Sequence, residues 1–158
     1  MRTLHRLCGL VLLWLVTASA VANAATLPPV ATQSGDVQGL MQDGVAVFRG
    51  LPYAAAPEGD LRWRAPQPAP RHKTVFDATS FGPVCPQSQR ASPYLAGVPM
   101  GEDCLRLNVY APAAAFAGGA RVPVMLWIHG GSFRWGAGSW PDGEPFVLAN
   151  QGVAVVTI

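Results

Sequence analysis

Apolar and polar residues alternate along several short stretches of the chain, with the period of two that half-buried β-strands show. The stretches Gly35–Leu40 and Gly44–Phe48 follow this pattern, and the Gln42-Asp43-Gly44 punctuation between them predicts a β-hairpin. A third stretch, Leu105–Tyr110, predicts a strand that places Leu105, Leu107 and Val109 on one face.

Two continuous apolar runs predict a different kind of strand. Val122–Ile128 and Val153–Ile158 are apolar on both faces, as in a sheet that is covered on both sides. Between them a short helix is predicted from Glu144 to Asn150, with Pro145 in its first turn and Gly152 as its C-terminal stop.

The remaining segments are predicted to be irregular. They are a Pro-containing lead, two loop-rich stretches and an Ala/Gly turn, at Ala25–Thr32, Arg49–Arg71, Phe81–Gly101 and Pro112–Gly119. Large aromatic residues in and near these segments are expected to lie in the core or to line a gorge, since such side chains are more often packed than free; they are Trp63, Trp127, Phe133 and Trp135.

The strand predicted at Val122–Ile128 ends abruptly in His129-Gly130-Gly131-Ser132. Glycines in this position let a ligand come close to backbone N–H groups. In the α/β-hydrolase pattern, a loop of the HGGG type after such a strand supplies an oxyanion hole, and the nucleophile lies on a later G-x-S-x-G turn. No G-x-S-x-G occurs in the 158 residues. The alternative interpretation is a glycine-rich turn with a purely structural role.

The first 24 residues have the three parts of a secretory signal peptide. Arg2 and Arg6 precede an apolar core at Leu7–Val16, and Ala22-Asn23-Ala24 predicts cleavage before Ala25, with Ala18-Ser19-Ala20 as a second possible site. A membrane anchor is the alternative, but the apolar core is short for a membrane span. We therefore expect a secreted or periplasmic protein with no membrane anchor after cleavage.

Charge and cysteine content narrow the function further. The formal net charge is +2, and without Arg2 and Arg6 nine basic residues face nine acidic ones. Nucleic-acid binding, which needs a clustered basic surface, is not indicated. Cys85 and Cys104 remain after signal cleavage, and in an oxidising compartment a disulfide between them is expected, with two free buried thiols as the alternative. Nothing at ligand spacing indicates a metal site.

Five segments taken together resemble the type B carboxylesterase family, which includes cholinesterases and bacterial para-nitrobenzyl esterases. They are FRGLPYA at 48–54, LRWRAP at 61–66, EDCLRLNVY at 102–110, LWIHGGSF at 126–133 and GAGS at 136–139. The resemblance implies an α/β-hydrolase fold, of which residues 25–158 would be the N-terminal part: a β-hairpin followed by strands of a central mixed sheet. It also implies a Ser–Glu/Asp–His triad beyond Ile158, and no cofactor.

The resemblance also implies roles for particular residues. Gly131 and Ser132 would donate the backbone N–H groups of the oxyanion hole, with His129 and Gly130 shaping the loop. Cys104 would pair with Cys85, and Arg62 would form a structural salt bridge with Glu102. The chain departs from the family pattern at Ser132, where Gly or Ala is usual, and at Arg106, where an aromatic residue or Thr is usual. The loop between the cysteines contains Tyr94 but no Trp, which disfavours a choline ester substrate.

The leading hypothesis is a carboxylic-ester hydrolase that works through an acyl-enzyme on a small-molecule ester. A non-catalytic adhesion or binding member of the same fold is the alternative, because fold does not imply chemistry. The chain is expected to be truncated at Ile158, and on its own to be inactive and not stably folded. The ester's acyl and alcohol groups and the oligomeric state are not indicated.

Overall fold

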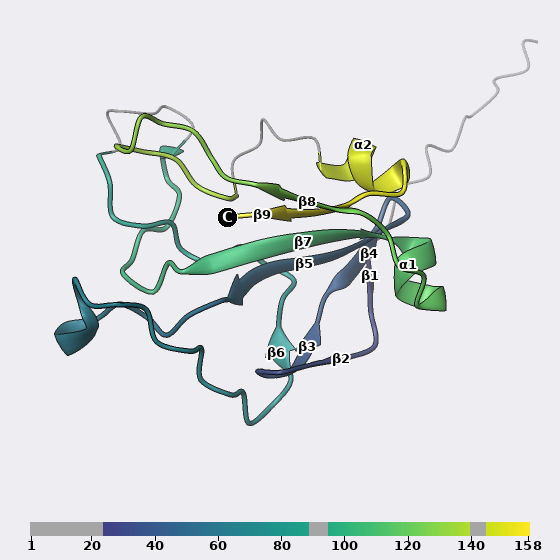
Figure 1. Ribbon diagram of the computed structural model, residues 1–158, viewed down its shortest axis with the longest axis horizontal. Coiled ribbons are helices and arrows are strands. Elements are labelled where there is room, and N and C mark those ends of the chain that lie inside the picture. The colour runs from purple at the N-terminus through teal and green to yellow at the C-terminus, as the bar shows by residue number, and fades with distance from the viewer. Residues whose placement is uncertain (1–23, 89–94, 140–144) are drawn as a thin grey trace, which may run out of the picture.

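The computed structural model describes residues 24–88, 95–139 and 145–158. The predicted signal peptide up to residue 23, Tyr94 and Glu144 lie outside these ranges. Within them, a main sheet has the strand order β1-β4-β5-β7-β9-β8, and a smaller sheet has the order β2-β3-β6 (Figure 1). The main strands are β1 Ala25–Thr26, β4 Leu40–Gln42, β5 Val45–Pro52, β7 Arg106–Pro112, β8 Val124–Trp127 and β9 Ala154–Thr157; the small sheet contains β2 Val30–Thr32, β3 Gly35–Gln38 and β6 Phe76–Asp77.

The predicted hairpin is present as β4 and β5. Gln42 pairs with Val45, so Asp43 and Gly44 form a two-residue turn. Both have positive φ, at 49° and 78°, as the type I′ turn of a tight hairpin requires. The predicted first strand is divided at Gly39, where an added Cβ would lie 2.2 Å from the Val47 carbonyl oxygen. Its two halves, β3 and β4, therefore belong to different sheets.

The lead Ala25–Thr32, in which no element was predicted, contains β1 and β2. β2 pairs antiparallel with β3, and the Thr32 hydroxyl donates to the Gly35 carbonyl across the turn at 2.6 Å. β1 pairs with β4 in the main sheet. Strands of two and three residues are too short to show a period of their own.

The prediction for β7 was right about the strand and incomplete about its faces. Val109 packs on a cluster with Phe48 on one side of the sheet, while Tyr110 packs with Val47 and Val155 on the other. The buried positions are Asn108, Tyr110 and Pro112, and the Leu107 and Val109 face is half-buried. Both faces of β7 are covered, because two hydrophobic clusters sandwich the sheet.

Two short helices cover these clusters from opposite sides. The turn predicted after Pro112 is instead a helix, α1 at Ala113–Gly118, which ends at Gly119 in the left-handed conformation with φ 64°. Its Phe116 packs against Phe48, with ring centroids 6.2 Å apart. The alanines of Ala113–Gly118 explain this helix, because alanine is the strongest helix former. The short helix predicted at Glu144–Asn150 is confirmed as α2 at Pro145–Asn150. Its Phe146 packs edge-on against Tyr110.

β8 is not buried on both faces as its apolar run predicted. β9 lies between β7 and β8 and has a buried Val155, whereas β8 is an edge strand of the described sheet. Val124 is 67% exposed and Leu126 55%. Trp63 and Phe133, expected in the core or a gorge, are also fully exposed in the described structure, at 96% and 112%. In the described ranges, no helix has the length and apolar character needed to cross a membrane.

Candidate oxyanion loop

The glycine-rich segment leaves the sheet at the end of β8, beside the end of β9. β8 and β9 are parallel, and Ile158 N–H donates to the Trp127 carbonyl at 3.1 Å. His129 N–H continues the ladder to the Ile158 carbonyl at 3.4 Å. The entry end of the loop is therefore fixed to the carboxyl end of a parallel strand pair, where ligand sites of α/β folds occur.

The loop itself is a tight turn closed on Gly131. The Gly131 carbonyl accepts from Arg134 N–H at 3.0 Å and from Trp135 N–H at 3.3 Å. An added Cβ at Gly131, where φ is 119°, would lie 1.6 Å from the Trp135 carbonyl oxygen. Gly131 is therefore required for the turn to close, whereas a Cβ at Gly130 would meet nothing within 4 Å.

The two residues after Gly131 are in the left-handed region, with φ 55° at Ser132 and 58° at Phe133. Ser132 can act as a backbone donor only if a residue with a Cβ can adopt the backbone angles of the loop. It does adopt them here, at a cost in strain, since left-handed conformations are disfavoured by about 1–2 kcal/mol per residue. Within the described residues, neither the Gly131 nor the Ser132 N–H donates a hydrogen bond. Unpaired N–H groups in a strained turn can serve an oxyanion.

His129 and Gly136 hold the two ends of the loop together. An added Cβ at the buried Gly136 would lie 2.2 Å from the His129 Nδ1 and 2.5 Å from the Gly130 carbonyl oxygen. The His129 Nδ1 itself lies 2.6 Å from the same carbonyl oxygen. This close contact fits the loop-shaping role expected of His129 and Gly130, and it needs a glycine at 136.

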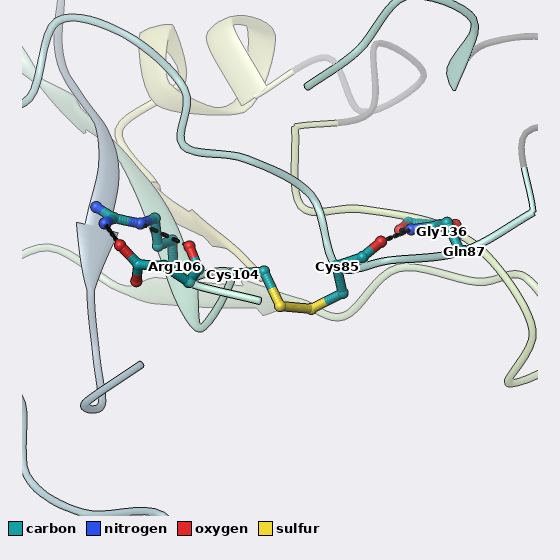
Figure 2. The surroundings of a disulfide bond; sticks show 6 residues. Cys85, Gln87, Cys104, Arg106 and Gly136 are labelled. Carbon is teal, nitrogen blue, oxygen red and sulfur yellow. Dashed lines mark hydrogen bonds and ion pairs between the residues drawn. A yellow bond between two sulfur atoms is a disulfide. The ribbon is translucent and has the colours of Figure 1, made fainter. Parts of the chain in front are cut away.

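The segment after the loop lies against the disulfide. Cys85 and Cys104 are bonded, with Cα atoms 5.0 Å apart, which confirms the predicted pairing. Figure 2 shows Gln87, two residues after Cys85, reaching Gly136 with its side-chain amide. The disulfide, His129 and Gly136 line one small cavity of about 110 Å³, together with Arg106 and Ser139.

Two polar groups that the sequence reading missed fix the surroundings of this cavity. The buried Asn108 accepts from Gly50 N–H at 2.9 Å and donates to the Thr157 hydroxyl at 3.0 Å and the Gly138 carbonyl at 3.2 Å. It thereby joins β5, β9 and the segment after the loop. A polar residue between Leu107 and Val109 was the available signal; for Gln87 the pattern of the chain offered none.

The predicted salt bridge is present but exposed. Arg62 Nε lies 2.9 Å from Glu102 Oε1, with the two side chains 54% and 38% exposed. Pairs this exposed contribute about 0–1 kcal/mol to stability. Among the described residues no group of three or more His, Cys, Asp or Glu side chains is placed to hold a metal ion.

The mixed sheet with helices on both faces, and the glycine-rich turn at the carboxyl end of the parallel pair β8 and β9, match solved esterases and identify the N-terminal portion of an α/β-hydrolase fold. The comparison with known proteins makes this specific: residues 26–158 match the model of the carboxylesterase family, and the chain belongs to that family.

Individual relatives agree with the family match. The para-nitrobenzyl esterase of Bacillus subtilis is 45% identical over 82% of this chain and 26% of its own length. The phenmedipham hydrolase of Pseudarthrobacter oxydans is 43% identical over 80% of this chain and 26% of its own length. A solved PNB esterase superposes with a TM-score of 0.75 at 45% identity, over 82% of this chain and 27% of that one. The chain thus spans about a quarter of the length of these relatives.

Proposed function

We propose that the protein to which these residues belong is a carboxylic-ester hydrolase that acts on a small-molecule ester through an acyl-enzyme. The observation that carries the proposal is the pair of N–H groups at Gly131 and Ser132, which find no acceptor among the described residues and lie at the end of β8 in a chain of the carboxylesterase family. An adhesion or binding module has no use for a strained loop of this kind.

The chemistry of the loop follows from where charge develops. When a nucleophile attacks an ester, the carbonyl oxygen becomes an oxyanion, and preorganised N–H donors stabilise it more than they stabilise the ground state. Gly131 and Ser132 would supply two such donors. The serine of a G-x-S-x-G turn, with its Glu/Asp and His partners, would be supplied by sequence outside these 158 residues.

The same proposal includes the compartment. A signal peptide at residues 1–24 would export the protein to the periplasm or the medium. The Cys85–Cys104 disulfide supports this, because disulfides persist in oxidising compartments and are rare in the cytosol. A fusion of residues 1–40 to a reporter enzyme that works only after export tests it, and a cytoplasmic reporter signal would contradict it.

The activity is tested in a hybrid esterase that joins residues 26–158 to the part of the Bacillus subtilis para-nitrobenzyl esterase beyond its matched region. We expect the hybrid to hydrolyse a short-chain aryl ester and to form an acyl-enzyme that is lost when the serine of its G-x-S-x-G turn becomes alanine. Residues 25–158 alone are the control and should give no turnover. A folded hybrid with no serine-dependent turnover would reject the proposal.

A further inference from the structure

We propose that Gln87 is a positioning residue for the oxyanion loop, and that the Cys85–Cys104 disulfide acts on the loop through it. The inference rests on the proposed ester hydrolase function and adds a residue outside the His129–Phe133 segment to that function. It starts from a side-chain amide that pairs with the backbone at the far end of the loop.

The Gln87 amide and the Gly136 backbone form a reciprocal pair. Gly136 N–H donates to Gln87 Oε1 at 2.6 Å, and Gln87 Nε2 donates to the Gly136 carbonyl at 2.9 Å. The side chain thus satisfies both polar groups of one peptide residue, as a neighbouring strand would. Because Gly136 is buried, loss of this partner would leave its backbone N–H and carbonyl unpaired, which is unfavourable away from water.

Gly136 in turn bears on the beginning of the loop. It lies so close to His129 and Gly130 that a single added carbon would overlap both. The entry end at His129 is held by β9, and the exit end at Gly136 is held by Gln87. The N–H groups of Gly131 and Ser132, without a hydrogen-bond acceptor in the described part of the chain, lie between these two ends, so a shift of Gly136 should move the donors.

The backbone of Cys85, one of the two disulfide residues, orients the Gln87 side chain. Gln87 Nε2 also donates to the Cys85 carbonyl at 3.0 Å, so the side chain folds back onto the residue that carries the disulfide (Figure 2). Cys104 lies two residues before β7, whose Arg106 donates to the Gly50 carbonyl of β5 at 2.8 Å. The disulfide therefore links β7 covalently to the segment that carries Gln87, and the hydrogen bonds of Gln87 to Gly136 extend this connection to the loop.

A residue with this role has a characteristic kinetic signature. Gln87 touches neither the proposed oxyanion nor the ester, so it should affect turnover through the position of Gly131 and Ser132. Misplaced donors weaken binding of the transition state, where the charge is full, more than binding of the ester. Loss of Gln87 should therefore lower kcat and leave KM nearly unchanged.

The test uses Gln87→Met in the hybrid esterase, because methionine keeps the length of the side chain and removes both amide contacts. We expect kcat on the aryl ester to fall about 10- to 100-fold, the range that an ångström-scale misplacement produces, with KM within about twofold of the parent value by the same transition-state argument. Gln67→Met is the matched control and should leave both constants unchanged, since the only described hydrogen bond of the Gln67 side chain goes to the nearby Ala65 carbonyl.

Hydrogen exchange supplies a readout that does not depend on turnover. Peptides covering residues 129–139 should exchange faster in Gln87→Met than in the parent hybrid, while peptides from β5 should exchange at the same rate. If Gln87→Met lowers the melting temperature of the hybrid substantially, Gln87→Glu decides, because its carboxylate can still accept from Gly136 N–H; it should give an intermediate kcat.

The outcomes separate the two proposals. A folded parent hybrid without turnover rejects the proposed function. Hydrogen exchange then still tests whether the contacts of Gln87 with Gly136 hold the loop in place. An active parent hybrid in which both Gln87 variants keep the parent kcat and the parent exchange rate overturns the role of Gln87. A rise in KM at constant kcat would also overturn it, since that would assign Gln87 to ester binding.

Discussion

At the scale of single residues, Ser132 places a side chain at a position of the loop where the backbone is in the left-handed region. Its φ of 55° is a conformation that glycine adopts freely and serine adopts at a cost. Its backbone N–H, and not its hydroxyl, is the proposed donor. The residue can therefore change without loss of function as long as the N–H remains.

The first prediction concerns this N–H. In the hybrid esterase, Ser132→Gly should keep kcat within about twofold, since it retains the proposed donor and relieves strain. Ser132→Pro should lower kcat by at least about 10²–10³, the loss that removal of one oxyanion donor typically causes, because proline lacks the N–H and its ring also excludes the φ of 55° at this position. Steady-state kinetics on an aryl ester measure both. Equal activity in the glycine and proline variants of a folded hybrid would exclude a donor at 132.

Arg106 shows what a single residue can conceal in the sequence. It stands at a position where the family pattern has an aromatic residue or Thr, and from the sequence it was simply a mismatch. In the structure its Nη1 donates to the Gly50 carbonyl at 2.8 Å and its Nε to the Asp103 carbonyl at 3.1 Å, and it forms an ion pair with Asp103. An added Cβ at Gly82 would lie 2.2 Å from its Cδ. The residue pattern of β7 cannot predict the contacts of Arg106 with Gly50 and Gly82, because both lie far from it in the sequence.

At the scale of elements, β7 and α2 meet through one aromatic contact. The Tyr110 and Phe146 rings have centroids 5.4 Å apart in an edge-on arrangement, and Tyr110 is 5% exposed. Burial raises the pKa of the Tyr110 phenol above its usual value, and the nearby Arg49 opposes this in part. The fold therefore favours the neutral phenol.

The second prediction follows from the sign of this shift. An unfolded chain ionises tyrosine near pH 10, so the stability that depends on neutral Tyr110 is complete below that pH and is lost as the pH rises through the raised pKa. Between about pH 9 and pH 11.5, on either side of the ordinary tyrosine pKa, Tyr110→Phe in the hybrid should lose less stability than the parent. Urea unfolding at both pH values measures this. If Tyr110→Phe loses as much stability as the parent over this pH range, the assignment to Tyr110 is contradicted.

The elements also show how far sequence reasoning reaches. The hairpin turn, β9 and α2 were predictable because their signals are local: a turn pair with positive φ, a β-branched run and a proline-started helix. The division of the first strand at Gly39 was not predictable, because it depends on the Val47 carbonyl across the hairpin. The residues of the oxyanion loop could be named from the sequence. The role of Gln87 could not, because it depends on a contact with Gly136, 49 positions away.

At the scale of the whole molecule, the edge of the main sheet is the dominant feature. β8 presents an unpaired strand edge in the described structure, and its side chains and those beside it are exposed and apolar: Val124, Met125, Leu126 and Ile128. Exposed apolar edge strands pair with other chains. The relatives carry about three times as much sequence again beyond the region that they share with this chain. We infer that this additional sequence covers β8 in a longer protein.

The third prediction contrasts the two situations with one pair of substitutions. Residues 25–158 alone should self-associate at micromolar concentration and bind a hydrophobic dye, and Val124→Glu with Leu126→Lys should reduce both, because the side chains lie on one exposed face. In the hybrid the same pair should lower stability by several kcal/mol, since burying unpaired charge is costly. Sedimentation velocity, dye fluorescence and urea unfolding measure these effects. If the two substitutions leave the hybrid as stable as its parent, β8 faces solvent in the hybrid too. If unsubstituted residues 25–158 are monomeric and bind no dye, the edge of β8 does not drive association.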